Sequence, residues 1–184
     1  MKIAIDLDNT LISFNKSWFD KLSDEYNYKL DDHTTWRLEN YSESFRVKSV
    51  ELFRNEIFLN SLLPYDGSYS KLQEWYDKKY EINVISARDL DLESITVSFV
   101  NRVFPMVSNT IIAGPLNTKE EFLRNGNYDV LIDDNPLCVK AASTVGIKYI
   151  YMVSNSDTRY NVSYIDDYKK CGVNIVSSVF EIEL

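Results

Sequence analysis

The chain has 184 residues, of which 45% are hydrophobic and 14% aromatic, and its formal net charge is −8. This length fits one domain, or one domain with a modest insertion, and the apolar share excludes a disordered composition. Binding of a long nucleic acid rests on clustered Lys and Arg, so an acidic chain is a poor candidate for it. A small phosphorylated substrate remains compatible, because a metal and one or two cations can meet its charge locally.

The sequence predicts a cytoplasmic protein with no membrane partner. Its first apolar run, MKIAIDLDNTL, contains acidic residues, unlike a secretory signal. No apolar stretch approaches the roughly 20 residues that span a bilayer. The two cysteines, Cys138 and Cys171, have neither metal-ligand nor redox spacing. We therefore expect two reduced thiols, with Cys138 buried on a helix.

Strand and helix patterns alternate along most of the chain. Short runs rich in β-branched residues predict strands at 2–6, 81–86, 110–113, 129–133 and 147–152, with a further short strand at 173–176. Apolar residues at helical spacing predict helices at 68–80, 92–103, 119–124 and 137–145, the last ending at Gly146 as its C-cap. This alternation indicates βαβ units, and so an α/β fold with a Rossmann-like parallel sheet and helices on both faces.

Residues 15–63 break the alternation. They contain two predicted helices, near 16–26 and 44–61, around a polar stretch with the only histidine, His33. We interpret this all-helical segment as a cap inserted after the first strand, on a core of residues 1–14 and 64–184, because it leaves from the loop that carries acidic residues. A helical hairpin packed on the side of the sheet is the alternative. His33 is expected on the surface, without a catalytic role.

Asp6 and Asp8 follow the first predicted strand, in the run Asp6-Leu7-Asp8-Asn9-Thr10. Side chains two residues apart on an extended segment face the same way, so both carboxylates can reach one phosphate. One can attack phosphorus and form an aspartyl-phosphate. The second can protonate the leaving oxygen and then deprotonate the attacking water. A solvated acidic turn is the alternative for this pair taken alone.

A second acidic pair, Asp133-Asp134, ends the strand predicted at 129–133. In a parallel sheet the carboxyl ends of the strands form the ligand-binding edge, so this pair should meet Asp6 and Asp8 there. Four carboxylates without a counterion would repel one another. Mg²⁺ prefers carboxylate and carbonyl oxygens and would relieve this repulsion while neutralising a substrate phosphate.

Three further polar residues are candidates for binding a phosphate. Ser86 ends the strand at 81–86, where its hydroxyl could bind phosphoryl oxygens or cap a helix. Arg88 could bind phosphate or another substrate anion, or form a surface ion pair. Lys119 begins a predicted helix, where its charge opposes the helix dipole, a conflict of the kind expected at a functional site. Taken alone, it would be interpreted as a solvated surface lysine.

Four elements, taken in chain order, resemble the motifs of the haloacid dehalogenase (HAD) superfamily over residues 2–152. They are Asp6/Asp8/Thr10, Ser86, Lys119 and Asp133/Asp134. The resemblance implies that Asp6 is the nucleophile and Asp8 the acid/base, with Ser86 and Lys119 at the phosphate. It also implies that Mg²⁺ is held by Asp6, the backbone carbonyl of Asp8 and one member of the second acidic pair. The sequence leaves open which of Asp133 and Asp134 is the direct ligand, and Asp133 is favoured because it comes first after the strand.

Within that superfamily the chain looks most similar to the 5′(3′)-deoxyribonucleotidases, on its size, its helical insertion, the ending Ile-Asp-Asp and Phe14 after the first motif. The resemblance implies a nucleoside monophosphate as substrate, with cap aromatics stacked on the base. Phe14, Trp18 and Phe45 are the candidates, and packing within the cap is the alternative for the last two. The ending Ser86-Ala87-Arg88 also resembles phosphatases that remove 3′ phosphates from nucleic-acid ends. Other small phosphate esters, or a non-catalytic HAD-like binding domain, are the remaining alternatives.

Overall fold

The computed structural model describes residues 1–35, 38–115 and 118–184. Over these ranges the chain forms one sheet with strands β1 (Lys2–Ile5), β2 (Glu81–Ser86), β3 (Asn109–Ile112), β4 (Val130–Asp133), β5 (Tyr149–Val153) and β6 (Asn174–Val176). The strand order is β3-β2-β1-β4-β5-β6, and every neighbouring pair runs parallel. The predicted Rossmann-like parallel sheet, including its short sixth strand, is confirmed.

The helices alternate with these strands beyond residue 67. They are α1 (Phe14–Tyr26), α2 (Glu43–Phe53), α3 (Glu56–Ser61), α4 (Ser68–Asp77), α5 (Glu93–Val103), α6 (Glu120–Gly126), α7 (Pro136–Val145) and α8 (Ile165–Lys170). Gly146 ends α7 with a φ of 82°, as predicted for its C-cap. In the part of the chain that the structure describes, no helix is long and apolar enough to cross a membrane.

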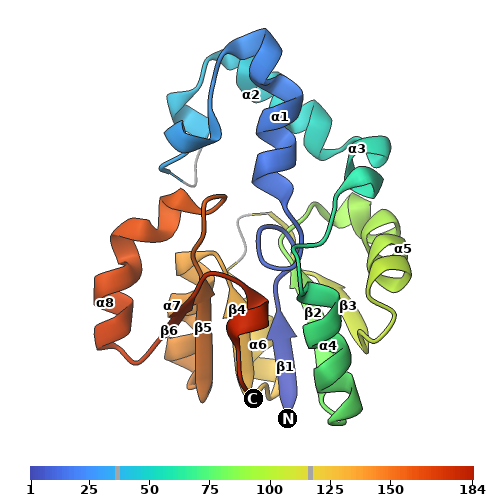
Figure 1. Ribbon diagram of the computed structural model, residues 1–184, viewed down its shortest axis with the longest axis vertical. Coiled ribbons are helices and arrows are strands. Elements are labelled where there is room, and N and C mark those ends of the chain that lie inside the picture. Colours follow the sequence, from blue (N-terminus) through green and yellow to red (C-terminus); the bar gives the residue numbers. More distant parts are fainter. Residues whose placement is uncertain (36–37, 116–117) are drawn as a thin grey trace.

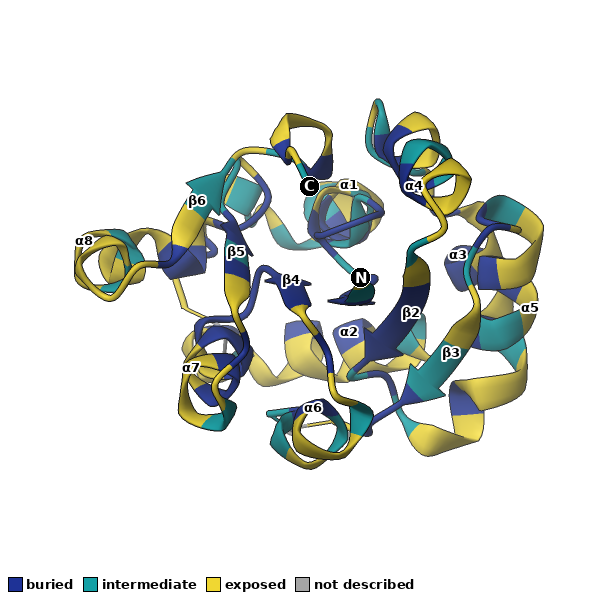
Figure 2. Cartoon of the chain, turned by 90° about the horizontal axis from the view of Figure 1, so that it is seen from below, coloured by how far each residue is buried: buried dark blue, intermediate teal, exposed yellow. Residues whose placement is uncertain are grey.

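The sheet separates two apolar clusters, because successive side chains of a strand point to opposite faces. Ile3 and Ile5 of β1 face the larger cluster, which includes Trp75 of α4 and Phe99 of α5. Ala4 faces the other cluster, with residues of α6 and α7. Figure 2 shows α6 and α7 on one face of the buried strands, and α4 with the C-terminal segment on the other.

The helices α1, α2 and α3 form a cap above the carboxyl ends of the strands (Figure 1). The predicted cap after the first strand is therefore confirmed. The single helix predicted over residues 44–61 is wrong, because the chain turns at Arg54 and Asn55 between α2 and α3. The side chain of Asn55 accepts a hydrogen bond from the Phe58 backbone N–H at 2.9 Å and so starts a new helix.

Two linkers that lie side by side connect the cap to the core. The Ser13 N–H donates to the Leu63 carbonyl at 3.1 Å, and the Tyr65 N–H donates to the Leu11 carbonyl at 2.9 Å. Because the chain leaves and re-enters the core at the same place, the cap can sit over the strand ends without disturbing the sheet. We propose that the cap comprises residues 15–63.

Candidate active site

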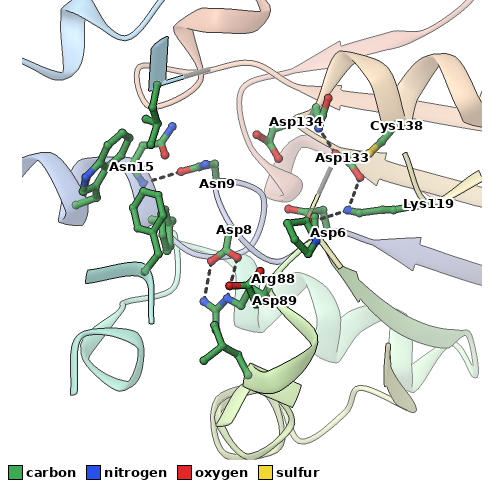
Figure 3. Close-up of a pocket in the computed structure, with 18 of the residues that line it drawn as sticks. Asp6, Asp8, Asn9, Asn15, Arg88, Asp89, Lys119, Asp133, Asp134 and Cys138 are labelled. Carbon is green, nitrogen blue, oxygen red and sulfur yellow. Dashed lines mark hydrogen bonds and ion pairs between the residues drawn. The ribbon is translucent and has the colours of Figure 1, made fainter. Parts of the chain in front are cut away.

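Lys119 joins the two predicted acidic motifs. Its Nζ donates to Asp6 Oδ1 at 2.5 Å and to Asp133 Oδ2 at 2.7 Å, across the gap between β1 and β4. Figure 3 shows the lysine side chain reaching between these two carboxylates. All three side chains are buried, and Lys119 is 1% exposed. The structure thus brings Asp6, Lys119 and Asp133 together, as expected for the ends of adjacent parallel strands.

The position of Lys119 carries conformational strain. It precedes α6 with a φ of 61°, in the left-handed region that residues with a Cβ rarely adopt. Such a backbone costs about 1 kcal/mol and persists where the surrounding contacts require it. Here Asp6 and Asp133 provide these contacts, because they hold the ammonium group at the strand ends.

Burial determines the charge balance of this cluster. It raises the pKa of Asp6 to about 7, an effect that Lys119 opposes and Asp133 reinforces. Burial also raises the pKa of Asp134 well above its ordinary value, with the charges of Asp6 and Asp133 acting in the same direction. For Lys119, burial lowers the pKa, but Asp133 and Asp6 outweigh it and hold the pKa well above 10.5. The cluster has more acids than cations and therefore favours a further positive charge.

The second acidic pair is held rigidly by its neighbours. Asp133 Oδ1 accepts from the Asn135 N–H at 2.8 Å, so both of its oxygens have donors once Lys119 is counted. Asp134 accepts from the Thr10 hydroxyl at 3.1 Å and from the Tyr160 hydroxyl. One oxygen from each of Asp6, Asp133 and Asp134 lies within 4.8 Å of the others. These hard oxygen ligands fit a magnesium ion.

Arg88 pairs with Asp8. Its Nε and Nη2 donate to the two oxygens of Asp8 at 2.9 and 2.7 Å, and Nη1 donates to the Thr96 hydroxyl at 3.4 Å. Of the roles weighed for Arg88, the structure shows an ion pair, formed by a buried guanidinium group and a partly exposed carboxylate. Figure 3 shows the Asp8 carboxylate turned toward Arg88, apart from the cluster around Asp6.

Ser86 lies where predicted, at the end of β2, but it is fully buried. Its hydroxyl accepts a hydrogen bond from the Arg88 N–H at 3.3 Å, which shapes the turn after the strand. The active-site residues line a cavity, and its described wall includes the next two residues, Ala87 and Arg88, but not Ser86. The predicted contact of Ser86 with phosphate therefore stays a prediction.

A cavity of about 290 Å³ extends from the acidic cluster to the cap. Its polar end is formed by Asp6, Asp8, Lys119, Asp133 and Asp134. Its apolar wall comprises the cap residues Phe14, Trp18, Leu38 and Phe53 together with Leu92 and Pro115 of the core. A phosphate group and an attached planar ring could therefore occupy its two ends at once.

Two of the three predicted ring contacts line this cavity. Phe14 packs at 5.1 Å from Phe53, measured between ring centroids, and both rings are part of the wall. Trp18 is also part of the wall, with its Nε1 donating to the Ser49 hydroxyl at 3.0 Å. Phe45 is fully buried behind Trp18 and is not part of the described wall, so its position favours packing within the cap.

The expectation that His33 is a surface residue is wrong. The side chain is 4% exposed and packs against Trp18, Phe19 and Tyr160. It also forms part of the cavity wall. The polar sequence around it predicted a loop, but the aromatic cap helices and the segment after β5 enclose this loop from both sides.

Several contributors to the site come from residues that the sequence did not single out. Tyr160, in the 3₁₀ helix η4 (Arg159–Tyr164), contacts Asp134. Asp157 Oδ2 accepts from Ser13 and Tyr65, both at 2.7 Å, and so ties both cap linkers to the loop after β5. Asn135 caps α7 through the Leu137 N–H. Only the Asn135-Pro136 pair carried a sequence signal, since Asn before Pro is typical of a helix start.

Cys138 is buried on α7, as predicted, and Cys171 is exposed. Burial raises the pKa of the Cys138 thiol well above its usual value. The thiol is therefore protonated at neutral pH and unsuited to be a nucleophile or a metal ligand.

The fold is shared with solved HAD proteins. A HAD family hydrolase from Deinococcus radiodurans R1, with bound phosphate and sodium, superimposes with a TM-score of 0.69 at 9% identity, covering 98% of this chain and 92% of that one. A haloacid dehalogenase-like hydrolase from Streptococcus pneumoniae gives 0.53 at 13% identity, covering 83% and 84%. These likenesses show that the chain has the fold of HAD-type hydrolases.

Sequence comparison narrows the class. Residues 1–169 match the model of the family described as "5′ nucleotidase, deoxy (Pyrimidine), cytosolic type C protein", and the chain belongs to this family. A curated relative, the 5′(3′)-deoxyribonucleotidase of Clostridium acetobutylicum, is 27% identical over 141 residues, which cover 73% of each chain. The resemblance inferred from the four motifs is thereby confirmed.

Proposed function

We propose that the protein is a Mg²⁺-dependent phosphomonoesterase that hydrolyses (deoxy)nucleoside monophosphates through an aspartyl-phosphate on Asp6. One observation carries the proposal: a single cavity joins the carboxylate of Asp6, fixed by Lys119, to an aromatic wall in the cap. Family membership and the deoxyribonucleotidase relative support the substrate class.

The three clustered carboxylates fit a divalent cation. Their oxygens lie close enough to share one ion, and their burial makes an uncompensated charge costly. Asp6, the backbone carbonyl of Asp8 and Asp134 would hold it. We favour Asp134 over Asp133 as the direct ligand, because Asp133 accepts from the cationic ammonium of Lys119, whereas the donors to Asp134 are the neutral hydroxyls of Thr10 and Tyr160. When bound, Mg²⁺ would neutralise the carboxylates and the substrate phosphate.

Asp6 has one oxygen available for attack. Oδ1 accepts from Lys119, which leaves Oδ2 without a hydrogen bond among the described residues. In the first step Oδ2 forms a bond to phosphorus while the bond from phosphorus to the ester oxygen breaks. Lys119 stays beside the carboxylate and offsets the negative charge that gathers on the phosphoryl oxygens. Water then attacks phosphorus and releases Asp6 and inorganic phosphate.

Asp8 supplies and recovers the proton in these two steps. It donates a proton to the ester oxygen as that oxygen leaves, and it takes a proton from the water that attacks the intermediate. Both of its oxygens accept from Arg88 in the structure. Asp8 must therefore leave the Arg88 pair to donate a proton. We propose that this pair is the resting arrangement and that the incoming phosphate replaces Asp8 at Arg88.

The enclosed cavity favours a small substrate. The cap helices lie over the strand ends, and aromatic residues from α1 and α2 close the apolar side. A mononucleotide places its phosphate at Asp6 and its base among Phe14, Trp18 and Phe53. A nucleic-acid 3′ end would have to pass the cap, and the net charge of −8 opposes a polyanion.

Phosphate release from a panel of substrates tests the proposal. The panel comprises deoxynucleoside and ribonucleoside monophosphates, 2-deoxyribose 5-phosphate and an aryl phosphate, each with Mg²⁺ and with EDTA. We expect Mg²⁺-dependent release, with higher kcat/KM for nucleotides than for 2-deoxyribose 5-phosphate. Equal kcat/KM for 2-deoxyribose 5-phosphate and the nucleotides would refute the nucleotide assignment. Release that persists in EDTA would refute the metal dependence.

A further inference from the structure

His33 is a buried, neutral imidazole in the wall of the cavity. Burial lowers the pKa of His33 to about 4, so the ring is uncharged at neutral pH. Its Nδ1 lies 3.0 Å from the hydroxyl oxygen of Tyr41. Among the described residues Nε2 has no hydrogen-bond partner. Because His33 is part of the cavity wall, a bound ligand could complete the hydrogen bond of this atom.

The contact with Tyr41 determines which ring nitrogen carries the proton. Burial raises the pKa of Tyr41 to about 12, so its hydroxyl is protonated. His33 Nδ1 is the only hydrogen-bond partner of that hydroxyl among the described residues. The Tyr41 hydroxyl therefore donates to Nδ1, and the hydrogen of the neutral ring resides on Nε2.

From these contacts we infer that the Nε2–H of His33 is a specificity-determining donor that binds a carbonyl oxygen of the nucleobase. The inference rests on the proposed function and deepens it, since it selects bases that present an oxygen in this position over bases that present an amino group. His33 is suited to this because it lies beside Trp18 in the cap and is part of the cavity wall. An amino group there would place two donors against each other.

Hypoxanthine and adenine make the sharpest pair of bases for the test. They differ at position 6, where hypoxanthine has a carbonyl oxygen and adenine an amino group, and adenine has no carbonyl oxygen elsewhere. Uracil and cytosine are a weaker pair, because both keep the carbonyl at position 2. The corresponding substrates are dIMP and dAMP, and 2-deoxyribose 5-phosphate is the control without a base.

The single histidine allows a direct measurement on the protein without a change at position 33. A long-range ¹H–¹⁵N NMR spectrum reports the protonation of both ring nitrogens of His33 alone. We expect the Nε2–H form in the free protein. We also expect the Nε2–H resonance to shift when dIMP is added to the Asp6→Asn variant with Mg²⁺, and to shift less with dAMP. An Nδ1–H form, or equal shifts with both nucleotides, would overturn the inference.

Kinetics of two variants provide the second test. In His33→Phe the ring remains but the donor is lost, so kcat/KM for dIMP should fall about tenfold relative to kcat/KM for dAMP, the value of one neutral hydrogen bond. His33→Gln keeps an N–H donor and should retain part of the preference. An equal loss on dIMP, dAMP and 2-deoxyribose 5-phosphate would overturn the inference and leave the proposed function standing. If the wild type itself does not prefer nucleotides to 2-deoxyribose 5-phosphate, both are overturned.

Discussion

Replacing Lys119 by methionine tests how much the buried ammonium group stabilises the carboxylates of Asp6 and Asp133. The side chain is 2% exposed and its ammonium contacts Asp6 and Asp133, whose side chains are 9% and 0% exposed. Removing one partner from a buried ion pair leaves an uncompensated charge and costs about 3–5 kcal/mol. Met has a similar length, so little packing is lost.

We therefore expect Lys119→Met, measured by urea unfolding in EDTA at pH 7.5, to lose about 3–5 kcal/mol of its unfolding free energy. Saturating Mg²⁺ should stabilise the protein, because an ion that binds only the folded state adds to its stability. Turnover of a nucleoside monophosphate should fall about 10²–10³-fold, the range for loss of one group that stabilises charge in the transition state.

Lys71→Met is the matched control. Lys71 is also buried, with a side chain that is 5% exposed, but its ion-pair partner Glu74 is 39% exposed and lies 3.0 Å away. Water can solvate the glutamate when the lysine is removed, so the electrostatic loss should be below about 1 kcal/mol. A loss in Lys119→Met no larger than that in Lys71→Met would refute the reasoning from burial.

Three further predictions follow from named contacts. Folded His33 has a pKa of about 4 against 6.5 when unfolded, so the unfolded chain binds more protons between these values and stability falls as pH falls through them. Urea unfolding gives the free energy of unfolding that is lost between pH 7.5 and pH 4.5. This loss should be about 3 kcal/mol smaller in His33→Phe than in the wild type, and an equal loss in both proteins would contradict the prediction. Arg88→Met should lower kcat/KM about 10²-fold, because the incoming phosphate loses the guanidinium group at which it would replace Asp8; steady-state kinetics that match the wild type would exclude this role. Tyr160→Phe removes a donor to Asp134 and should raise the Mg²⁺ concentration for half-maximal activity about 10–100-fold, with an unshifted titration as the contrary result.

The sequence predicted the parts of the site that follow from regular structure. Ser86 and Asp133 end strands and Asp6 directly follows one. Parallel strands bring their carboxyl ends to one edge, so the proximity of these residues follows from the alternating pattern. Lys119 was found by its conflict with the helix dipole. The direction of its side chain, toward both Asp6 and Asp133, then depends on a backbone conformation that no periodicity encodes.

The sequence did not predict contacts made between irregular segments. His33 and Tyr160 lie 127 residues apart in the chain, yet their rings pack at 5.5 Å between centroids. Each stands in a polar stretch that is typical of an exposed loop, and only the cap and the segment after β5 together bury them. The break at Asn55 was missed for a related reason, since the apolar residues on either side keep a helical spacing across the cap.

The central claim is that Asp6 forms the covalent intermediate. Mass spectrometry tests it most directly, on protein that is quenched in acid during turnover with Mg²⁺ and a nucleoside monophosphate and then reduced with borohydride. Reduction converts an aspartyl-phosphate into homoserine, and we predict homoserine at position 6, with none when substrate is omitted. The Asp8→Asn variant should accumulate more of it, because the intermediate loses the base that activates water. An unmodified Asp6 during active turnover, or homoserine at position 8 instead, would contradict the account.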